Sequence, residues 1–182
     1  DVDFLGYRGV APEETKRKCT DWTARITDAV AEDSPSLVLT SFFSRKETVD
    51  DGSGRSQTEQ YRDGLESRWK RWTDGGARVV VLGDPPLNAE VRDYQCVALN
   101  PADPAVCAVD RAVAQPADPL TEVARTSTNP DVALVDFSDY FCDERKCHAV
   151  IGNIAVYYDA DHLNAAFSRT LTPMLDEVIA QR

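Results

Sequence analysis

The sequence predicts a three-layer α/β/α protein in which helices cover both faces of a parallel β-sheet. Amphipathic stretches with a period of three to four residues alternate with short apolar runs along the chain. The runs are apolar throughout, which is typical of strands that are buried in a parallel sheet. A chain of 182 residues with 42% hydrophobic content is long enough for one domain with its own core, and we expect no second domain.

The predicted elements alternate in kind along the chain. In order, they are a helix over residues 13–33, a strand over 37–43, a helix over 58–77, a strand over 78–84, a helix over 119–130, a strand from 131, an extended stretch over 153–158 and a helix over 164–181. The second helix carries Trp69 and Trp72 on one face, which we expect in the core. Residues 87–118 are proline-rich and are expected to be irregular. Pro173 should kink the last helix or mark its start.

The acidic composition excludes one class of partner. The formal net charge is −11 at pH 7, and an acidic surface repels phosphate backbones, so nucleic acid is not an expected partner. No apolar run approaches the roughly 20 residues of a membrane span, and the first residues lack the basic and apolar regions of a signal peptide. Any export signal or membrane anchor is therefore expected outside these residues.

The five cysteines divide into two local pairs and one single residue, Cys19. In an exported protein, the two pairs predict two short-loop disulfides. Zinc is the alternative, because Cys142, Cys147 and His148 lie close together. However, the chain lacks a second ligand pair with the spacing that tetrahedral zinc favours, so we expect no metal and no cofactor. The single cysteine predicts a free thiol, an intermolecular bond or a partner outside this chain.

A histidine with acidic neighbours stands near the C-terminus. Asp159 and Asp161 precede His162 by three residues and by one. Serine-type hydrolysis needs an imidazole that removes a hydroxyl proton and a carboxylate that holds its other ring nitrogen. Asp159 has the spacing to reach that nitrogen across a turn, whereas Asp161 is expected to cap the last helix. The alternative is structural, because acidic residues commonly precede helices.

Other polar residues follow the predicted strands, where parallel sheets place their sites. Ser41 and Ser44 lie at the end of the first strand without a Gly-x-Ser-x-Gly elbow. Gly83 lies at the end of the second strand without the longer glycine signature of a phosphate-binding loop. Ordinary strand ends explain both segments more simply. His148 adjoins the second cysteine pair and is expected to be exposed.

Taken together, these segments resemble the SGNH hydrolase-like domain fused to the C-terminus of family 3 membrane acyltransferases, which are bacterial enzymes that O-acylate cell-surface glycans. The resemblance runs through most of the chain. It covers "SPSLVLTSFF", "LESRWKRWTDGGARVVVLGDPP", "YQCVALNPADPAVC", "VDFSDYFCDERKC" and "VYYDADHLNAAF". The last segment, preceded by the paired cysteines, is the most specific part.

The resemblance implies the fold, the site and the location. The sheet would be flavodoxin-like, in a single SGNH-like domain over residues 1–182. His162 would be the general base and Asp159 its orienting carboxylate, and the disulfides would be Cys96–Cys107 and Cys142–Cys147. The domain would work outside the cytoplasmic membrane, tethered to it through a transmembrane domain that lies outside this chain.

The family's nucleophilic serine stands in a Gly-Asp-Ser block on the first strand, and this sequence contains no Gly-Asp-Ser. We therefore expect the first strand and its helix to precede Asp1, together with a cysteine that pairs with Cys19. The serine would receive an acyl group, which is expected to be acetyl, from a membrane acyltransferase domain and pass it to a glycan hydroxyl. Backbone N–H groups, one of them near Ser41, would hold the oxyanion. The alternatives are a secreted esterase and an inactive glycan-binding or interaction domain.

Overall fold

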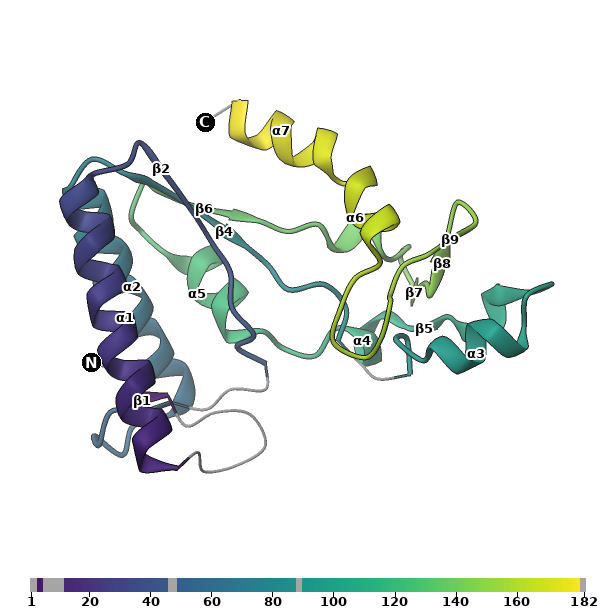
Figure 1. Ribbon diagram of the computed structural model, residues 1–182, viewed down its shortest axis with the longest axis horizontal. Helices are drawn as coiled ribbons and strands as arrows, with labels where there is room; N and C mark the ends of the chain where they lie inside the picture. Colours follow the sequence, from purple (N-terminus) through teal and green to yellow (C-terminus); the bar gives the residue numbers. More distant parts are fainter. Residues whose placement is uncertain (1–2, 5–11, 46–48, 88–89, 181–182) are drawn as a thin grey trace. The chain divides into compact units, whose positions relative to one another are not determined.

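The computed structural model describes residues 3–4, 12–45, 49–87 and 90–180 of the chain (Figure 1). The chain divides into two compact units. Unit 1 comprises Asp1–Asp84 and Ala117–Asp136, and unit 2 comprises Pro85–Pro116 and Phe137–Arg182.

Unit 1 is built on a parallel sheet of three strands. They are β2 (Leu37–Thr40), β4 (Arg78–Leu82) and β6 (Val132–Val135), in the order β2-β4-β6. The register pairs Val79 with Val38 on one side and with Val132 on the other. Strands from three separate parts of the chain thus lie parallel, which confirms the predicted α/β class.

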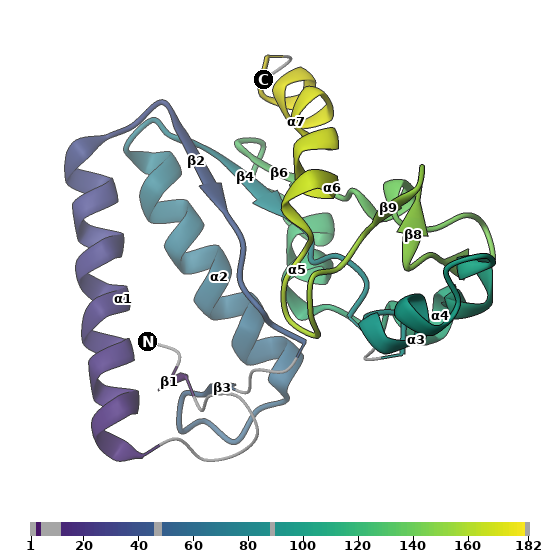
Figure 2. The same cartoon turned by 45° about the vertical axis from the view of Figure 1, so that its right-hand side comes forward.

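The described helices of unit 1 are α1 (Glu13–Asp33), α2 (Gln57–Asp74) and α5 (Pro119–Thr126). Helices α1 and α2 run side by side (Figure 2). A capping box starts α2: the Ser56 side chain accepts from the Glu59 amide, and the Glu59 carboxylate accepts from the Ser56 amide. The chain turns back at Gly76, whose φ of 92° suits glycine. A short antiparallel pair joins β1 (Asp3–Phe4) to β3 (Val49–Asp50).

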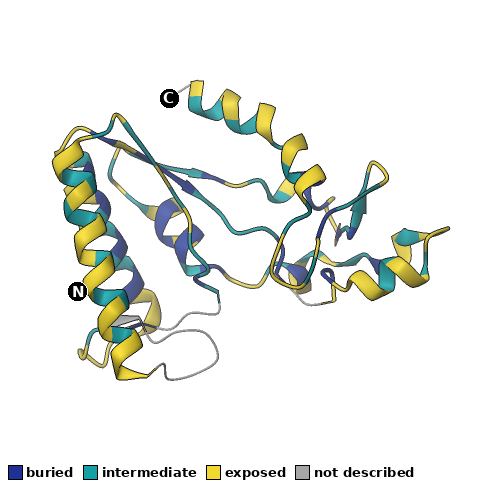
Figure 3. Cartoon of the chain, in the orientation of Figure 1, coloured by how far each residue is buried: buried dark blue, intermediate teal, exposed yellow. Residues whose placement is uncertain are grey.

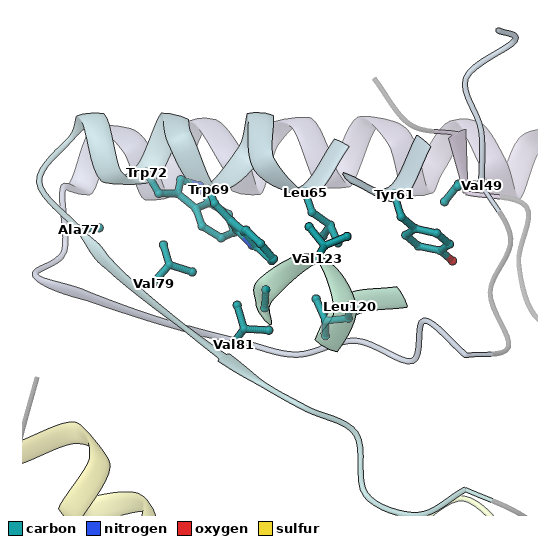
Figure 4. Packing of buried hydrophobic residues seen from close by; sticks show 11 residues of the cluster. Val49, Tyr61, Leu65, Trp69, Trp72, Ala77, Val79, Val81, Leu120 and Val123 are labelled. Carbon is teal, nitrogen blue, oxygen red and sulfur yellow. The ribbon is translucent and has the colours of Figure 1, made fainter. Parts of the chain in front are cut away.

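An aromatic face of α2 forms the core of unit 1. Its large side chains point toward β4 and α5 in Figure 4, where they meet Val79, Val81, Leu120 and Val123. Trp69 and Trp72 are 1% and 6% exposed, so their predicted place in the core is confirmed. Helices α2 and α5 thus both contribute to the core that lies against β4.

The side of unit 1 that carries α1 and β2 is less buried than the sequence predicts. Helix α1 has no buried residue (Figure 3), and Trp22 is 58% exposed. The parallel strand predicted over 37–43 is present, but its predicted length and burial are wrong, because it ends at Thr40 and Leu39 is 44% exposed. The reason is position: within the described ranges β2 pairs only with β4, so it is an edge strand.

Unit 2 contains short elements that are held together by disulfides and by pairing of short strands. The segment 87–118, expected to be irregular, contains several of them apart from residues 88–89, which lie outside the description. They are α3 (Tyr94–Leu99), the 3₁₀ helix η1 (Pro104–Cys107), β5 (Val109–Asp110) and α4 (Arg111–Ala114). Order arises because a disulfide joins α3 to η1 and because β5 pairs with β7 (Lys146–Cys147).

The C-terminal part of unit 2 ends in two helices instead of one. Its elements are η2 (Ser138–Tyr140), β8 (Val150–Ile151), β9 (Ile154–Ala155), α6 (Ala165–Thr170) and α7 (Thr172–Ala180). The expected extended stretch forms a hairpin, since β9 pairs antiparallel with β8. The helix is interrupted at Leu171, and Pro173 lies in the first turn of α7, where its missing N–H is tolerated. The predicted effect of this proline is confirmed, although residue 181 lies outside the described part.

A buried hydrogen-bond network ties the loop after β2 to the start of α5. Ser44 is 1% exposed and Asp118 is 6% exposed. The hydroxyls of Ser44 and Thr121 both donate to the Asp118 carboxyl group, and the Thr121 amide donates to it at 3.3 Å. The Leu120 amide donates to the Ser44 hydroxyl at 3.1 Å. Ser44 is therefore a structural residue.

Replacing Asp118 with alanine is expected to lower the free energy of unfolding by about 2–4 kcal/mol, because buried donors lose their acceptor. Asp93→Ala is the matched control, since Asp93 caps α3 at an exposed position and should cost about 1 kcal/mol or less. Urea denaturation of both variants measures the difference. Equal losses would contradict the role assigned to the buried network.

Candidate active site

The candidate catalytic residues stand on a tight turn between β9 and α6. A bridge between Tyr157 and Leu163 closes the turn, and the Tyr158 amide donates to the His162 carbonyl at 2.9 Å. Val156 is fully buried, Tyr157 is 6% exposed, and Leu163 packs against the core of unit 2. Both ends of the turn are therefore anchored, while the residues between them reach solvent.

The structure brings Asp159 and His162 together at the top of this turn. Nδ1 of the imidazole lies 2.8 Å from Oδ1 and 3.0 Å from Oδ2 of Asp159. The same Oδ1 accepts from the backbone amides of Asp161 and His162, each at 2.8 Å. One carboxylate thus both closes the turn and holds the ring.

The environment of Asp159 favours its charged form. The backbone N–H of Asp161 makes the largest contribution to lowering the pKa of Asp159, and the hydrogen bond from the His162 side chain comes next. With Nδ1–H donating to this carboxylate, Nε2 is the ring nitrogen that keeps a lone pair. The His162 side chain is 72% exposed, so Nε2 is accessible to a reacting hydroxyl.

Asp161 does not cap the last helix, which corrects the prediction. Asn164 is the N-cap residue of α6, and its side-chain oxygen accepts from the Ala166 amide at 2.8 Å. An N-cap residue must immediately precede the first helical residue, and α6 begins only at Ala165. The backbone N–H of Asp161 is instead part of the turn around Asp159.

A second histidine–aspartate pair lies in unit 2, and the sequence analysis did not identify it. Nε2 of His148 lies 2.9 Å from Oδ2 of Asp143, within and just after the loop closed by Cys142 and Cys147. Backbone N–H groups of Arg145 and Lys146, followed by the His148 side chain, lower the pKa of Asp143 to about 2. The His148 side chain is 32% exposed, so it is less open than predicted. The five-residue spacing was the only signal in the sequence.

Both predicted disulfides are present: Cys96 is bonded to Cys107, and Cys142 to Cys147. The latter two sulfurs are thus unavailable as zinc ligands. Within the described ranges, no three His, Cys, Asp or Glu side chains are grouped to hold a metal ion. Cys19 lies partly buried on α1 and forms no disulfide with another cysteine of this chain.

The polar strand ends of unit 1 have structural contacts. Ser41 is exposed just past β2, and its hydroxyl donates to the Leu82 carbonyl at 3.0 Å. Gly83 follows β4, and a Cβ there would lie 3.0 Å from the Thr121 hydroxyl. Glycine therefore permits a close approach within the fold. Ser41 belongs to unit 1 and His162 to unit 2, so the oxyanion role of Ser41 stays a prediction.

A parallel α/β sheet and an exposed aspartate–histidine pair are features that a serine-type hydrolase or acyltransferase needs, and the family to which the chain belongs supports that class. A family model described as an SGNH domain fused to AT3 domains matches residues 2–177. The chain belongs to this family, which confirms the resemblance seen in the sequence. No curated protein and no solved structure matches the chain.

The disulfides and the membership of the SGNH family also indicate where the protein is located. Disulfides form and persist in oxidising compartments, so the two bonds indicate an extracytoplasmic location. Fusion to AT3 domains in the family indicates that a membrane acyltransferase domain tethers the protein. None of the helices in the described ranges has both the length and the apolar character that crossing a membrane requires.

The carboxyl group of Asp159 is expected to titrate below the ordinary aspartate value of about 3.9. Because folding lowers this pKa, the stabilisation is present above the unfolded value and is lost as pH falls through the folded pKa. In His162→Ala the pKa of Asp159 should rise but stay below the ordinary aspartate value, because the hydrogen bond from the Asp161 amide, which lowers this pKa most, remains. Carboxyl ¹³C NMR of the domain measures both midpoints.

Asp143 provides the internal control for this titration. Its midpoint should remain at about 2 in His162→Ala, because its partners are Arg145, Lys146 and His148. An Asp159 midpoint that does not change in the variant would show that the imidazole does not interact with it in solution.

Proposed function

We propose that the chain is the SGNH domain of an extracytoplasmic acyltransferase that moves an acyl group, acetyl in the simplest case, onto a hydroxyl of a cell-surface glycan. One observation carries the proposal: an anchored turn holds Nδ1 of His162 against Asp159 and leaves Nε2 accessible. This is the arrangement a general base needs to act on a hydroxyl. Membership of the family supports acyltransferase or esterase chemistry.

In the proposed mechanism, His162 Nε2 takes the proton of a serine hydroxyl as the serine oxygen attacks the acyl carbonyl. The proton then passes to the leaving group of the donor, and an acyl-serine forms. Next, Nε2 takes the proton of a glycan hydroxyl, whose oxygen attacks the acyl-serine. The serine leaves with that proton, and Asp159 stabilises the imidazolium in both steps. Backbone N–H groups, one of them near Ser41, stabilise the oxyanion.

The nucleophile is proposed to stand on a further strand that precedes Asp1. Two features of unit 1 support this placement. Strand β2 has one hydrogen-bonded neighbour in the described part of the chain, and Leu39 on it is 44% exposed. Helix α1 exposes Trp22 and Ile26. A further parallel apolar strand would supply the sheet with additional hydrogen-bonding partners, and with it the sheet would gain the Gly-Asp-Ser block.

The partners follow from the same proposal. A fused membrane acyltransferase domain supplies the acyl group, and the acceptor is a cell-surface glycan. Hydrolysis requires only water in place of the sugar, so a secreted esterase is the neighbouring alternative. The other alternative is a catalytically inactive domain of the same fold that binds glycans or a protein partner.

In the full-length protein, His162→Ala is expected to lower turnover of p-nitrophenyl acetate on the order of 10³-fold or more, because the general base is lost. The matched control is His148→Ala, which removes the other of the two histidines and should leave turnover near the wild-type rate. Release of nitrophenol measures both rates.

A fluorophosphonate probe separates the enzymatic proposal from the binding alternative. It should label one serine of the wild-type protein, and the labelling should slow in His162→Ala but not in His148→Ala. If no serine of the full-length protein reacts, the enzymatic proposal is wrong and the binding alternative is favoured.

Cys19 is proposed to pair with a cysteine upstream of this chain. In non-reduced full-length protein, iodoacetamide should leave Cys19 unmodified, and peptide mass spectrometry should find it joined to an upstream cysteine peptide. After reduction, alkylation of Cys19 should be complete. A fully alkylated Cys19 without reduction would contradict the pairing, and the Cys96–Cys107 peptide provides the control for an intact disulfide.

A further inference from the structure

Arg92 is the only lysine or arginine among the described residues that is buried, at 5% exposure. It lies in unit 2, beside the fully buried Val91, in the proline-rich segment before α3. Burying a guanidinium has a large desolvation cost unless its N–H groups find acceptors. The partners of Arg92 therefore show what its burial achieves.

The guanidinium joins two segments that are far apart in the sequence. Nε donates to the Pro86 carbonyl at 2.8 Å, and Nη1 donates to the Ala160 carbonyl at 2.9 Å. Its Cζ atom lies 5.1 Å from the ring centroid of Tyr157, which anchors the turn. Two of these three contacts are with the turn that carries Asp159 and His162.

The contact with Ala160 acts on a specific peptide group. The Ala160 carbonyl and the Asp161 N–H belong to the same peptide unit, which is planar and has its C=O and N–H on opposite sides. Arg92 binds the carbonyl end, and the N–H end donates to Asp159 Oδ1 at 2.8 Å. Fixing one end of this unit fixes the direction of the other. A cation on the carbonyl also polarises the peptide and strengthens the N–H as a donor.

We propose that Arg92 is a positioning residue, which aligns the Asp159 carboxylate and through it the His162 imidazole by holding the Ala160–Asp161 peptide. This role rests on the proposed acyl-transfer function of the His162 site. Arg92 is buried and acts through the peptide, so it has no need to touch the substrate. Its loss should therefore slow the chemical step and leave substrate binding nearly unchanged.

Arg111 offers a matched control in the same unit. It also joins separate segments through its guanidinium, donating to the Asp143 carbonyl at 3.0 Å and to the Asp139 carboxylate at 2.7 Å. These contacts are with the disulfide loop and η2 instead of the turn at Asp159. Arg92→Met and Arg111→Met thus both remove a guanidinium that connects two segments, but only the first substitution affects the turn at Asp159.

The experiment compares Arg92→Met, Arg92→Lys and Arg111→Met with the wild type in the full-length protein. With p-nitrophenyl acetate, Arg92→Met should lower kcat on the order of 10- to 100-fold with KM within about twofold, because a small misalignment of reacting groups is costly. Arg92→Lys should recover part of kcat, since it restores a charged donor. Arg111→Met should keep both constants near those of the wild type.

Amide hydrogen–deuterium exchange of the same four proteins tests the turn without any need for activity. Exchange in the peptide that contains Asp161 and His162 should be faster in Arg92→Met than in the wild type. In Arg92→Lys it should be slower than in Arg92→Met, and in Arg111→Met it should equal that of the wild type. Unchanged exchange in Arg92→Met would overturn the inference. Faster exchange throughout unit 2, without rescue by lysine, would also overturn it and show a merely structural role.

Turnover and hydrogen–deuterium exchange together distinguish a failure of the Arg92 inference from a failure of the proposed function. If the wild-type protein has no turnover and no serine that reacts with the probe, the proposed function fails. The exchange measurement still decides whether Arg92 holds the turn. If turnover is present and Arg92→Met reduces it only through KM, the positioning role is wrong although the proposed function stands.

Discussion

The candidate site depends on the single carboxylate of Asp159. Its oxygens accept from two backbone amides and from the imidazole of the same turn. An exposed ion pair by itself contributes little to stability, because water competes for both partners. The order of this pair must therefore come from the backbone bonds to Asp159 and from the anchored ends of the turn. The buried ends of the turn thus support an exposed aspartate–histidine pair.

The two histidine–aspartate pairs of unit 2 differ in which ring nitrogen contacts the carboxylate and in how exposed the imidazole is. In the pair with Asp159, Nδ1 is bound and Nε2 faces outward on a side chain that is 72% exposed. In the pair with Asp143, Nε2 is bound and the side chain is only 32% exposed. The first arrangement leaves Nε2 available for the proposed role as a general base, whereas the second links a disulfide loop to the chain that follows it. Residue type alone does not distinguish them.

Among the described residues, each unit contains one buried charged residue that fixes a loop through hydrogen bonds. In unit 1, Asp118 collects the donors of Ser44 and Thr121 and so joins the loop after β2 to α5. In unit 2, Arg92 donates to the carbonyls of Pro86 and Ala160. Such residues are costly to bury, so they are retained where a loop must adopt one position. In both units the loop held in this way carries polar residues near a predicted site.

The sequence by itself determined the features that depend on short-range order. The helical spacing of Trp69 and Trp72 placed both in the core, and the three-residue spacing of Asp159 and His162 allowed their contact within one turn. The local cysteine pairs were equally accessible, because short spacing limits the possible partners. Sequence motifs also sufficed to recognise the family.

Only the tertiary structure decided which residues far apart in the chain meet. Arg92 and Ala160 are separated by 68 positions, and Ser44 and Asp118 by 74, so no periodicity or local motif connects them. The edge position of β2, which exposes Leu39, depends on which strands pair, and a strand's own residues do not reveal that. Asp161 is not the helix cap because α6 begins at Ala165 and Asn164 occupies the N-cap position. Strand pairing and contacts between distant segments are properties of the packed chain, and local sequence does not contain them.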